Sequence, residues 1–398
     1  MASHLESEMA GDLRTGGDLN LQAESLRRSS ATTIGRNLQT IPRLADGTPR
    51  YARGWHMVGW SDEFPKGQAV ARDYFGMRLA FYRGDDGQLR CLEAFCPHLG
   101  ADLSAGKVLG NALQCPFHNW QFNGGGDCVK IPYCDKIPPK AKARSFVTKE
   151  INDTALIWFD PERGEPEYDI PALAEFGTAG WTPQWHRFRI TIKTHAREVI
   201  ENVVDKGHLL PIHGFDVEQW LPVWNGHVTG ELTWGKHTRL AADVQDDKLY
   251  VRNISHGPAY QYTWQIQDSG QFDSLILTSW CPVDENTLEY WFGVIVKANS
   301  TAFTAEMLEA AAEGYCKASY DAFMEDVYIW ERKLYRPEPT LCGNDGPIAK
   351  LRRWYSQFYT DRAQVNVSQF HNDNHHWTIQ DLRDRTSDVI AAQAHRSS

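Results

Sequence analysis

Long apolar runs, an excess of basic charge and nucleotide-binding glycines are all missing from this 398-residue sequence. No stretch of roughly eighteen apolar residues occurs, and the amino terminus lacks a charged segment followed by an apolar one, so we expect neither a membrane-spanning helix nor a secretory signal. The net charge of −10 argues against nonspecific nucleic-acid binding, which requires basic surface. No glycine fingerprint follows a predicted strand, so the chain is not expected to bind a dinucleotide itself.

The cysteines also lack the spacing of a disulfide framework, although there are eight of them. Two stand in motifs with histidine, and the other six are most simply free thiols of a reducing cytosol, which predicts a cytoplasmic protein. The chain is long enough to bury two substantial cores. The six cysteines outside the motifs are Cys91, Cys128, Cys134, Cys281, Cys316 and Cys342.

Two short motifs, Cys96-Pro97-His98 and Cys115-Pro116-Phe117-His118, are separated by sixteen residues. Each places one thiolate and one imidazole on a tight loop. This set suits a [2Fe-2S] cluster in which two cysteines bind one iron and two histidines bind the other. A Cys2His2 zinc site uses the same ligand types, but the C-x-H spacing is shorter than is usual for zinc fingers.

The sequence around these motifs favours small antiparallel sheets with protruding loops. The apolar runs 79–83 and 88–92 flank Gly84-Asp85-Asp86-Gly87, which predicts a hairpin that leads into the first loop. After the second loop, the run 119–122 predicts a further strand, which ends at the glycines 124–126.

A second group of metal-ligand residue types lies at Asp205, His208 and His213, in the pattern D-x-x-H-x4-H. Asp205 and His208 share one face of a helix, and we expect Pro211 to interrupt that helix and bring His213 around. Two imidazoles and one carboxylate can hold ferrous iron with open positions. The alternative is a helix end at which one histidine caps the helix and the other lies in the core.

The carboxylate of such a triad has to come from elsewhere in the chain. A long helix is predicted from about Thr304 to Tyr335, because this stretch is rich in Ala, Glu, Met and Leu and has no internal proline. Near its end lie Glu325 and Asp326. The residues alone leave both of them open as ligands, beside the alternative that both are solvated surface groups.

Taken together, these motifs resemble the Rieske non-haem iron oxygenases. The resemblance implies that Asp326 is the third iron ligand, because the family carries it in an Asp-x-x-Ile-Trp context like that of residues 326–330. It also implies that Asp205 links an iron-binding histidine to a cluster histidine of the neighbouring subunit, and thus a ring of identical chains, most simply a homotrimer. Alternatively, Asp205 only orients His208.

Four further segments are similar to the oxygenase components of the 3-ketosteroid 9α-hydroxylases. This resemblance implies O2-dependent hydroxylation of a steroid-like apolar substrate, with electrons from a separate flavin reductase, a ferredoxin or both. The same group includes sterol desaturases, so desaturation, or demethylation of another substrate, is an alternative. An electron carrier with a binding domain is the non-enzymatic alternative. The four segments are Ala52–His56, Lys130–Tyr133, Ile137–Pro139 and Leu351–Tyr355.

The expected fold class is α+β, with an all-β Rieske domain and a helix-grip-like catalytic domain of antiparallel sheet and long helix. Strands are expected at 155–159, 275–280 and 290–296. The predicted divisions are a polar extension at 1–49, with a helix near residues 21–28, a Rieske domain at 50–165, a catalytic domain at 166–380 and a tail at 381–398. The His-rich residues 371–376 are expected to form a solvated turn. Basic residues after the second loop are a weak candidate for a docking patch (Lys130, Lys136, Lys140, Lys142 and Arg144).

Overall fold

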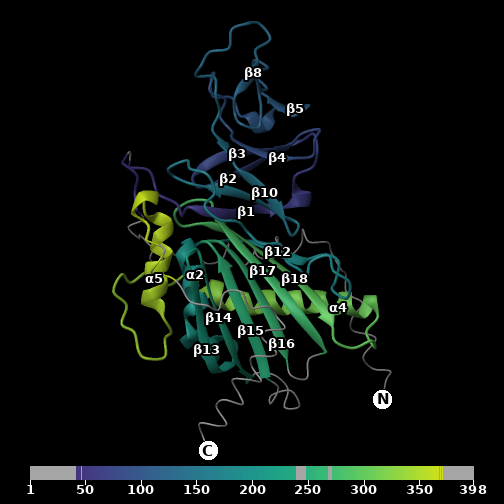
Figure 1. Cartoon of the computed structure of the whole chain (residues 1–398), viewed down its shortest axis with the longest axis vertical. Helices are drawn as coiled ribbons and strands as arrows, with labels where there is room; N and C mark the ends of the chain where they lie inside the picture. Colours follow the sequence, from purple (N-terminus) through teal and green to yellow (C-terminus); the bar gives the residue numbers. More distant parts are fainter. Residues whose placement is uncertain are drawn as a thin grey trace, which may run out of the picture. The chain divides into compact units, whose positions relative to one another are not determined.

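The computed structural model describes residues 42–45, 47–238, 248–267, 271–366, 368 and 370. These residues form four antiparallel sheets with a few helices, which confirms the α+β class (Figure 1). Most of the predicted extension, with its helix near residues 21–28, lies outside the described residues, as do the His-rich turn at 371–376 and the tail at 381–398. No helix among the described residues combines the length and the apolar character needed to cross a membrane.

Two sheets make up most of the first part of the chain. In the four-stranded sheet, of order β2-β3-β4-β9, Arg83 pairs with Leu89 across the turn, which confirms the predicted hairpin. The three-stranded sheet has the order β1-β11-β10, and its middle strand contains the predicted run 155–159. The strands are β1 (Gly54–Trp60), β2 (Ala69–Tyr74), β3 (Met77–Arg83), β4 (Leu89–Glu93), β9 (Ser145–Phe146), β10 (Thr148–Ile151) and β11 (Thr154–Phe159).

A small sheet, β5-β6-β7-β8, lies next to the two Cys–His loops. The strand predicted at 119–122 is shorter than expected, because Asn119 has a positive φ of 59° and belongs to the loop. The strands are β5 (Lys107–Leu109), β6 (Ala112–Gln114), β7 (Gln121–Phe122) and β8 (Cys128–Lys130). The short 3-10 helix η1 (Ser61–Glu63) follows β1, and η2 (Leu103–Ala105) precedes β5.

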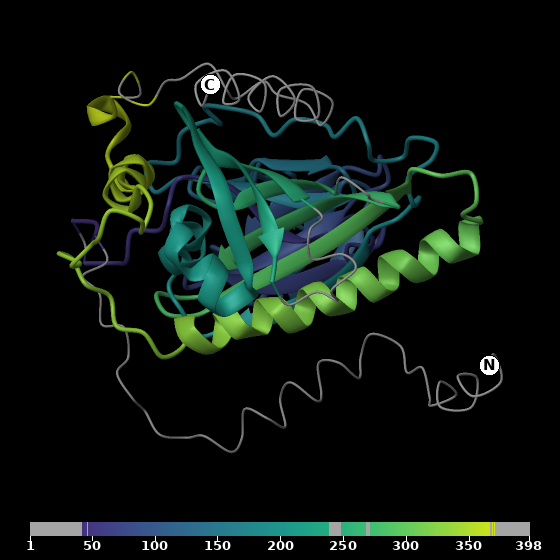
Figure 2. The same cartoon turned by 90° about the horizontal axis from the view of Figure 1, so that it is seen from below.

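A seven-stranded antiparallel sheet of order β12-β18-β17-β16-β15-β14-β13 dominates the second part. The strands predicted at 275–280 and 290–296 lie inside β17 and β18, so both predictions are confirmed. Figure 2 shows the long helix α4 running along this sheet. The strands are β12 (His186–Ile192), β13 (Phe215–Asn225), β14 (Val228–His237), β15 (Lys248–His256), β16 (Tyr260–Gln267), β17 (Phe272–Pro282) and β18 (Leu288–Ala298).

Helix α4 (Ala305–Trp330) begins where the sequence predicts and ends five residues before Tyr335. Its N-cap is Thr304, whose hydroxyl oxygen accepts a hydrogen bond of 3.2 Å from the backbone N–H of Met307. The shorter helices are α2 (Ala196–Val204), α3 (Leu209–His213) and α5 (Ile348–Ser356), with the 3-10 turns η3 (Lys206–His208), η4 (Gln357–Tyr359) and η5 (Arg362–Gln364).

One hydrophobic core joins the three-stranded sheet and the four-stranded sheet β2-β3-β4-β9 to the seven-stranded sheet. Trp55 of β1 and Trp158 of β11 belong to the same buried cluster as Tyr260 of β16 and Trp291 of β18. Burial of such large rings contributes on the order of 2–3 kcal/mol each. The two parts of the chain are therefore packed together through apolar side chains, and not only connected by the segment 161–166.

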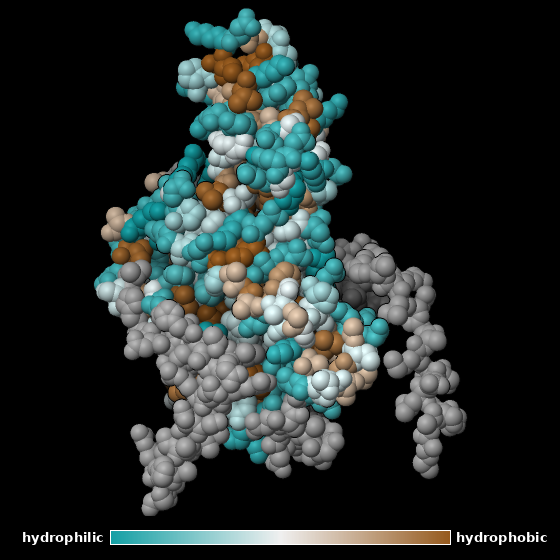
Figure 3. Space-filling model, turned by 45° about the vertical axis from the view of Figure 1, so that its right-hand side comes forward, coloured by the Kyte–Doolittle hydropathy of each residue, from teal (hydrophilic) through white to brown (hydrophobic). Residues whose placement is uncertain are grey.

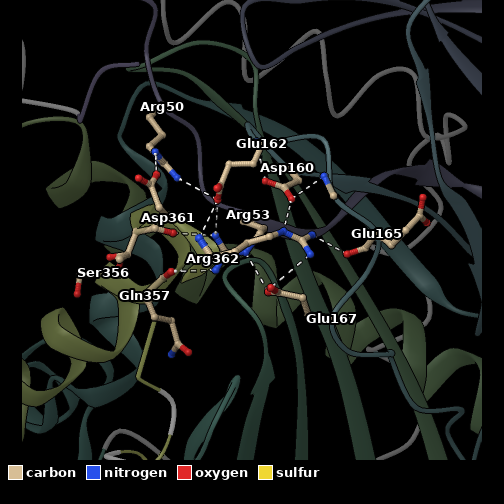
Figure 4. A network of polar contacts seen from close by, with 12 residues as sticks. Arg50, Arg53, Asp160, Glu162, Glu165, Glu167, Ser356, Gln357, Asp361 and Arg362 are labelled. Carbon is tan, nitrogen blue, oxygen red and sulfur yellow. Dashed lines mark hydrogen bonds and ion pairs between the residues drawn. The ribbon is translucent and has the colours of Figure 1, made fainter. Parts of the chain in front are cut away.

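A polar network joins residues 160–167, which connect the two parts, to Arg53 and to residues 357–362 (Figure 4). Arg53, only 2% exposed, donates to Glu167 at 2.9 Å and to the backbone oxygen of Thr360 at 2.8 Å. Arg362 contacts Asp160 through Nε at 2.6 Å. Because the arginines bind carboxylates and backbone carbonyls from both sides of the connection, the network fixes the start of the second part against the end of the first.

Candidate metal centres

The two Cys–His loops have the same backbone design despite their different histidine positions. The backbone oxygen of Cys96 accepts from the N–H of Gly100 at 2.9 Å, and that of Cys115 accepts from the N–H of Asn119 at 3.1 Å. Gly100 and Asn119 both have positive φ, at 78° and 59°, a conformation that Gly and Asn tolerate best. A rigid proline follows each cysteine, so each loop holds its thiol in a fixed direction.

These loops bring together the four residues that the motifs single out. Cys96 and Cys115 are buried, at 3% and 2% exposure, while His98 and His118 are half-buried with ring centroids 4.7 Å apart. Two buried sulfurs and two outward imidazoles fit the donor set of a cluster with unequal irons. Trp120 stacks on the His98 ring with centroids 4.4 Å apart and planes 8° apart, which restrains that imidazole.

Apolar side chains are exposed around these loops. Figure 3 shows hydrophobic atoms gathered at the end of the molecule where β5 and β8 lie in Figure 1. Of the basic residues proposed as a patch, four are exposed, and one of these, Lys142, pairs with Asp127 at 2.8 Å. Arg144 is only half-exposed and packs over the Phe146 ring. The exposed apolar residues include Phe95, Leu99, Phe117, Val129 and Tyr133.

The second group of ligand types lies on α2, η3 and α3. The prediction that Pro211 interrupts a helix is wrong, because the helix breaks earlier, at Asp205 (φ −78°, ψ 85°). The Asp205 carboxylate accepts from the N–H of Gly207 at 3.1 Å and thereby caps η3. Pro211 lies in the first turn of α3, where its missing N–H costs nothing. Gly214, in the left-handed conformation, ends α3 directly after His213.

The structure brings His208 and His213 together with Asp326 of α4. One potential ligand atom from each residue lies within 4.8 Å of the others. Nε2 of His213 lies 3.2 Å from Oδ2 of Asp326. The ring centroids of His208 and His213 are 5.2 Å apart. Burial lowers the pKa of His208, an effect partly offset by the Asp326 carboxylate, so the ring is neutral and offers a nitrogen lone pair. This donor set fits a two-histidine, one-carboxylate iron site.

Glu325, the rival carboxylate, occupies a different position. Its side chain is 45% exposed, whereas that of Asp326 is 9% exposed. Adjacent residues of a helix point about 100° apart, so only Asp326 shares the inward face with Ala322 and Trp330, which line the cavity described below. The orientation of α4 therefore decides which of the two neighbouring acids can be the ligand, a choice that the sequence leaves open.

Asn202 is a site residue that the sequence reasoning missed. Its amide nitrogen lies 3.3 Å from Nε2 of His208 and 3.3 Å from Oδ2 of Asp326. An amide here can orient His208 of η3 and Asp326 of α4 relative to each other. The only signal in the sequence was a polar residue between Val199 and Val203 on the apolar face of α2.

Asp205 lies beside His208 and is half-exposed. Its carboxylate Oδ2 is 3.8 Å from Nδ1 of His208, and the same nitrogen lies 2.5 Å from the backbone oxygen of Asp205. The side chain is 39% exposed, so one side of the carboxylate faces away from the protein interior.

A cavity of about 660 Å³ opens beside the His208, His213 and Asp326 cluster. Phe215, Phe292, Phe323 and other apolar residues form much of its wall, together with a polar stretch on the sheet. Such a volume and lining suit a drug-sized apolar molecule with a few polar groups. The candidate metal centre thus lies at the wall of a cavity large enough for a polycyclic substrate.

Two family models together match most of the residues that the structure describes. The model for the Rieske [2Fe-2S] domain matches residues 54–146, and the model for the 3-ketosteroid 9α-hydroxylase C-terminal domain matches residues 157–359. The chain belongs to the 3-ketosteroid 9α-hydroxylase family of Rieske oxygenases.

Sequence similarity to relatives extends over most of the length of this oxygenase. It is 34% identical to a 3-ketosteroid-9-alpha-monooxygenase oxygenase component from Rhodococcus rhodochrous, over 88% of each chain. It is 30% identical to a cholesterol 7-desaturase from Ciona intestinalis, over 80% of this chain and 71% of the relative. The crystal structure of dicamba monooxygenase bound to 3,6-dichlorosalicylic acid has a TM-score of 0.65 and 19% identity, and covers 79% of this chain and 100% of that one. This last likeness concerns the fold alone.

Family membership decides two alternatives left open by the sequence. A Rieske oxygenase holds a [2Fe-2S] cluster and a mononuclear non-haem iron and uses O2, so the zinc alternative is excluded. The Rhodococcus relative is a monooxygenase component, so this oxygenase is an enzyme and not an electron carrier with a binding domain.

Proposed function

We propose that this oxygenase is the terminal component of a multicomponent monooxygenase that hydroxylates a steroid-like apolar molecule. The observation that carries the proposal is the convergence of His208, His213 and Asp326 on the wall of a large, mostly apolar cavity. The names of the Rhodococcus relatives favour a 3-ketosteroid. Desaturation of a sterol is the second candidate, favoured by the likeness to the Ciona enzyme.

In this proposal each residue has a defined role. Cys96 and Cys115 bind one cluster iron, while His98 and His118 bind the other, within a cluster domain at 50–165. His208, His213 and Asp326 hold the mononuclear iron in a catalytic domain at 166–380. When bound, the cluster supplies single electrons and the iron activates O2. The apolar wall excludes water and places one C–H bond of the substrate beside the three ligands.

We propose that electrons pass between neighbouring chains of a homotrimer. In Figure 1, β5 and β8 beside the cluster loops are separated from α2, which leads into the iron-site histidines, by the strands β1 to β4 and β10. This separation favours transfer from the cluster of one chain to the iron of another. Asp205, half-exposed beside His208, is the proposed bridge. Its replacement in Asp205→Asn is expected to leave both metal groups bound but to abolish most turnover.

We further propose that a flavin reductase, a ferredoxin or both deliver the electrons. The exposed apolar residues around the cluster loops, such as Leu99 and Phe117, support a contact with another protein there. A cytoplasmic location is proposed because no cysteine forms a disulfide and the six outside the cluster motifs, including the exposed Cys134 and Cys342, are free thiols.

Iron content and product analysis test the proposal together. Wild-type enzyme should hold about three irons per chain, two in the cluster and one at the mononuclear site. His213→Ala and Asp326→Ala should each lose the single iron, retain the visible absorbance of the cluster, and stop oxygenation. Glu325→Ala is the matched control and should retain all the iron. Retention of the single iron in both site variants would refute the ligand assignment.

Product mass distinguishes the two candidate reactions. With 18O2 and a surrogate reductase, a 3-ketosteroid should gain one labelled oxygen if the enzyme hydroxylates. Loss of two hydrogens without label would instead favour desaturation. Turnover of purified enzyme with NADH and no added partner would refute the need for a separate reductase.

A further inference from the structure

The sheet side of the cavity carries a polar stretch that the iron chemistry does not use. Strand alternation places the odd-numbered residues of β14, β15 and β16 on this wall. Across the strands, Glu231 lies opposite Asn253, and Asn253 lies opposite Thr263. These residues come from the sheet, whereas the proposed iron ligands come from α3, η3 and α4.

Glu231 is the most unusual of these residues. It is 4% exposed and lines the cavity, yet its Oε2 atom has no hydrogen-bond partner within the described part of the chain. Its cross-strand neighbour Asn253 likewise has a buried Oδ1 atom without a partner among the described residues. Two adjacent unsatisfied oxygens in an apolar cavity are costly, so a ligand that supplies their hydrogen bonds would be bound tightly.

Burial also decides the charge of Glu231. Loss of hydration raises the pKa of its carboxyl well above the usual value, so the group is protonated at neutral pH. A protonated carboxyl has an O–H to donate, and it does not repel an electron-rich oxygen. A carboxylate ligand would be disfavoured, because its own charge would lose hydration in a poorly hydrated site.

We propose that Glu231 and Asn253 form a subsite for an uncharged oxygen, a ketone or a hydroxyl, at one end of the apolar substrate. This inference rests on the proposed steroid-like substrate and extends it. A ketone oxygen accepts the Glu231 hydrogen bond, while a hydroxyl accepts from Glu231 and also donates to Asn253 Oδ1. By holding one end of a rigid skeleton, the subsite selects which carbon reaches the iron ligands.

Binding measurements on the oxidised holoenzyme without reductase test the subsite apart from catalysis. Quenching of tryptophan fluorescence is a suitable signal, because Trp220 and Trp330 line the cavity. The probes are a 3-ketosteroid, its 3-hydroxy counterpart, the corresponding 17-oxo pair, and analogues that lack the 3-oxygen or the 17-oxygen. For one of these positions, removal of the oxygen should weaken binding to wild type about tenfold, the loss expected for one buried hydrogen bond.

The variants separate hydrogen bonding from packing. Glu231→Leu should weaken the oxygenated probes about tenfold and leave the deoxygenated probe unchanged, whereas Glu231→Gln, which retains a donor, should stay within about threefold of wild type. Asn253→Leu should weaken the hydroxyl probe and spare the ketone. Glu218→Gln, an exposed residue on β13, is the control.

Four results would overturn the inference. Equal binding of oxygenated and deoxygenated probes to wild type would show that no oxygen is recognised. An equal loss for all probes in Glu231→Leu, with full iron content, would show a packing defect. If wild type binds none of the steroids, the proposed substrate class itself is wrong and the subsite inference falls with it. Binding of steroids without the Glu231 effect refutes only the subsite.

Discussion

Replacement of Arg53 by methionine should destabilise the protein by about 3–5 kcal/mol without removing metal from the folded enzyme. Methionine fills much of the space of the arginine stem but has no guanidinium. The variant therefore loses the hydrogen bonds to the backbone oxygens of Thr360 (2.8 Å) and Gln357 (3.3 Å), and the contact with Glu167 (2.9 Å). None of these partners belongs to a candidate metal centre.

The magnitude follows from how exposed each partner is. Two backbone carbonyls, one buried and one partly buried, lose a charged donor, and each such hydrogen bond contributes about 1.5–3 kcal/mol. The Glu167 carboxylate is 41% exposed and still lies 3.4 Å from Arg362, so its ion pair with Arg53 adds no more than about 1 kcal/mol. Most of the loss therefore comes from the unsatisfied carbonyls.

Urea unfolding at pH 7, followed by tryptophan fluorescence, measures the change as a lower midpoint at an unchanged slope. The control is Arg43→Met, because the Arg43 side chain is 53% exposed in its ion pair with Glu285 and should contribute less than about 1 kcal/mol. The Arg53 effect should persist in 1 M NaCl, since the buried contacts are poorly screened. An Arg53→Met midpoint equal to that of Arg43→Met would refute the reasoning.

Three further predictions concern pH and local structure. Burial lowers the pKa of His56 to about 4, so the folded ring stays neutral while the unfolded chain takes up a proton below about pH 6.5. Stability should fall as the pH drops from about 6.5 to 4, by on the order of 3 kcal/mol, and a wild-type slope no steeper than that of His56→Gln would contradict this. Gly214→Ala should cost about 1 kcal/mol in urea unfolding, because φ is 67°, and should weaken iron retention at the adjacent His213; unchanged stability would count against it. Thr304→Ala should cost about 1 kcal/mol through loss of the N-cap of α4, and Thr304→Ser should restore most of it in the same assay.

Local chemistry made much of this protein predictable. The hairpin of β3 and β4 follows from alternating apolar residues around a glycine-containing turn, and α4 follows from helix propensity with a threonine cap. Close pairs such as Cys96 with His98 encode a short loop whose two ligand types must lie together. In these cases residues near in sequence determine the structure, and distant contacts change only the ends of the elements.

Two features were not predicted from the sequence, one for a local reason and one because it joins distant residues. The break at Asp205, rather than at Pro211, arises because a carboxylate can cap the next turn, a local alternative that competes with the proline signal. The Asn202 contact with Asp326 joins residues 124 positions apart, and no spacing in the sequence marks it.

The sequence by itself determined the kind of chemistry, because the metal-ligand residues lie at short spacings in the chain and their motifs resemble those of a known family. Only the tertiary structure decided which acid joins the two histidines, since the rotation of α4 buries Asp326 and exposes Glu325. It alone also placed Glu231 and Asn253 side by side in the cavity. Register between strands, fixed by the packing of the whole sheet, determines such pairs.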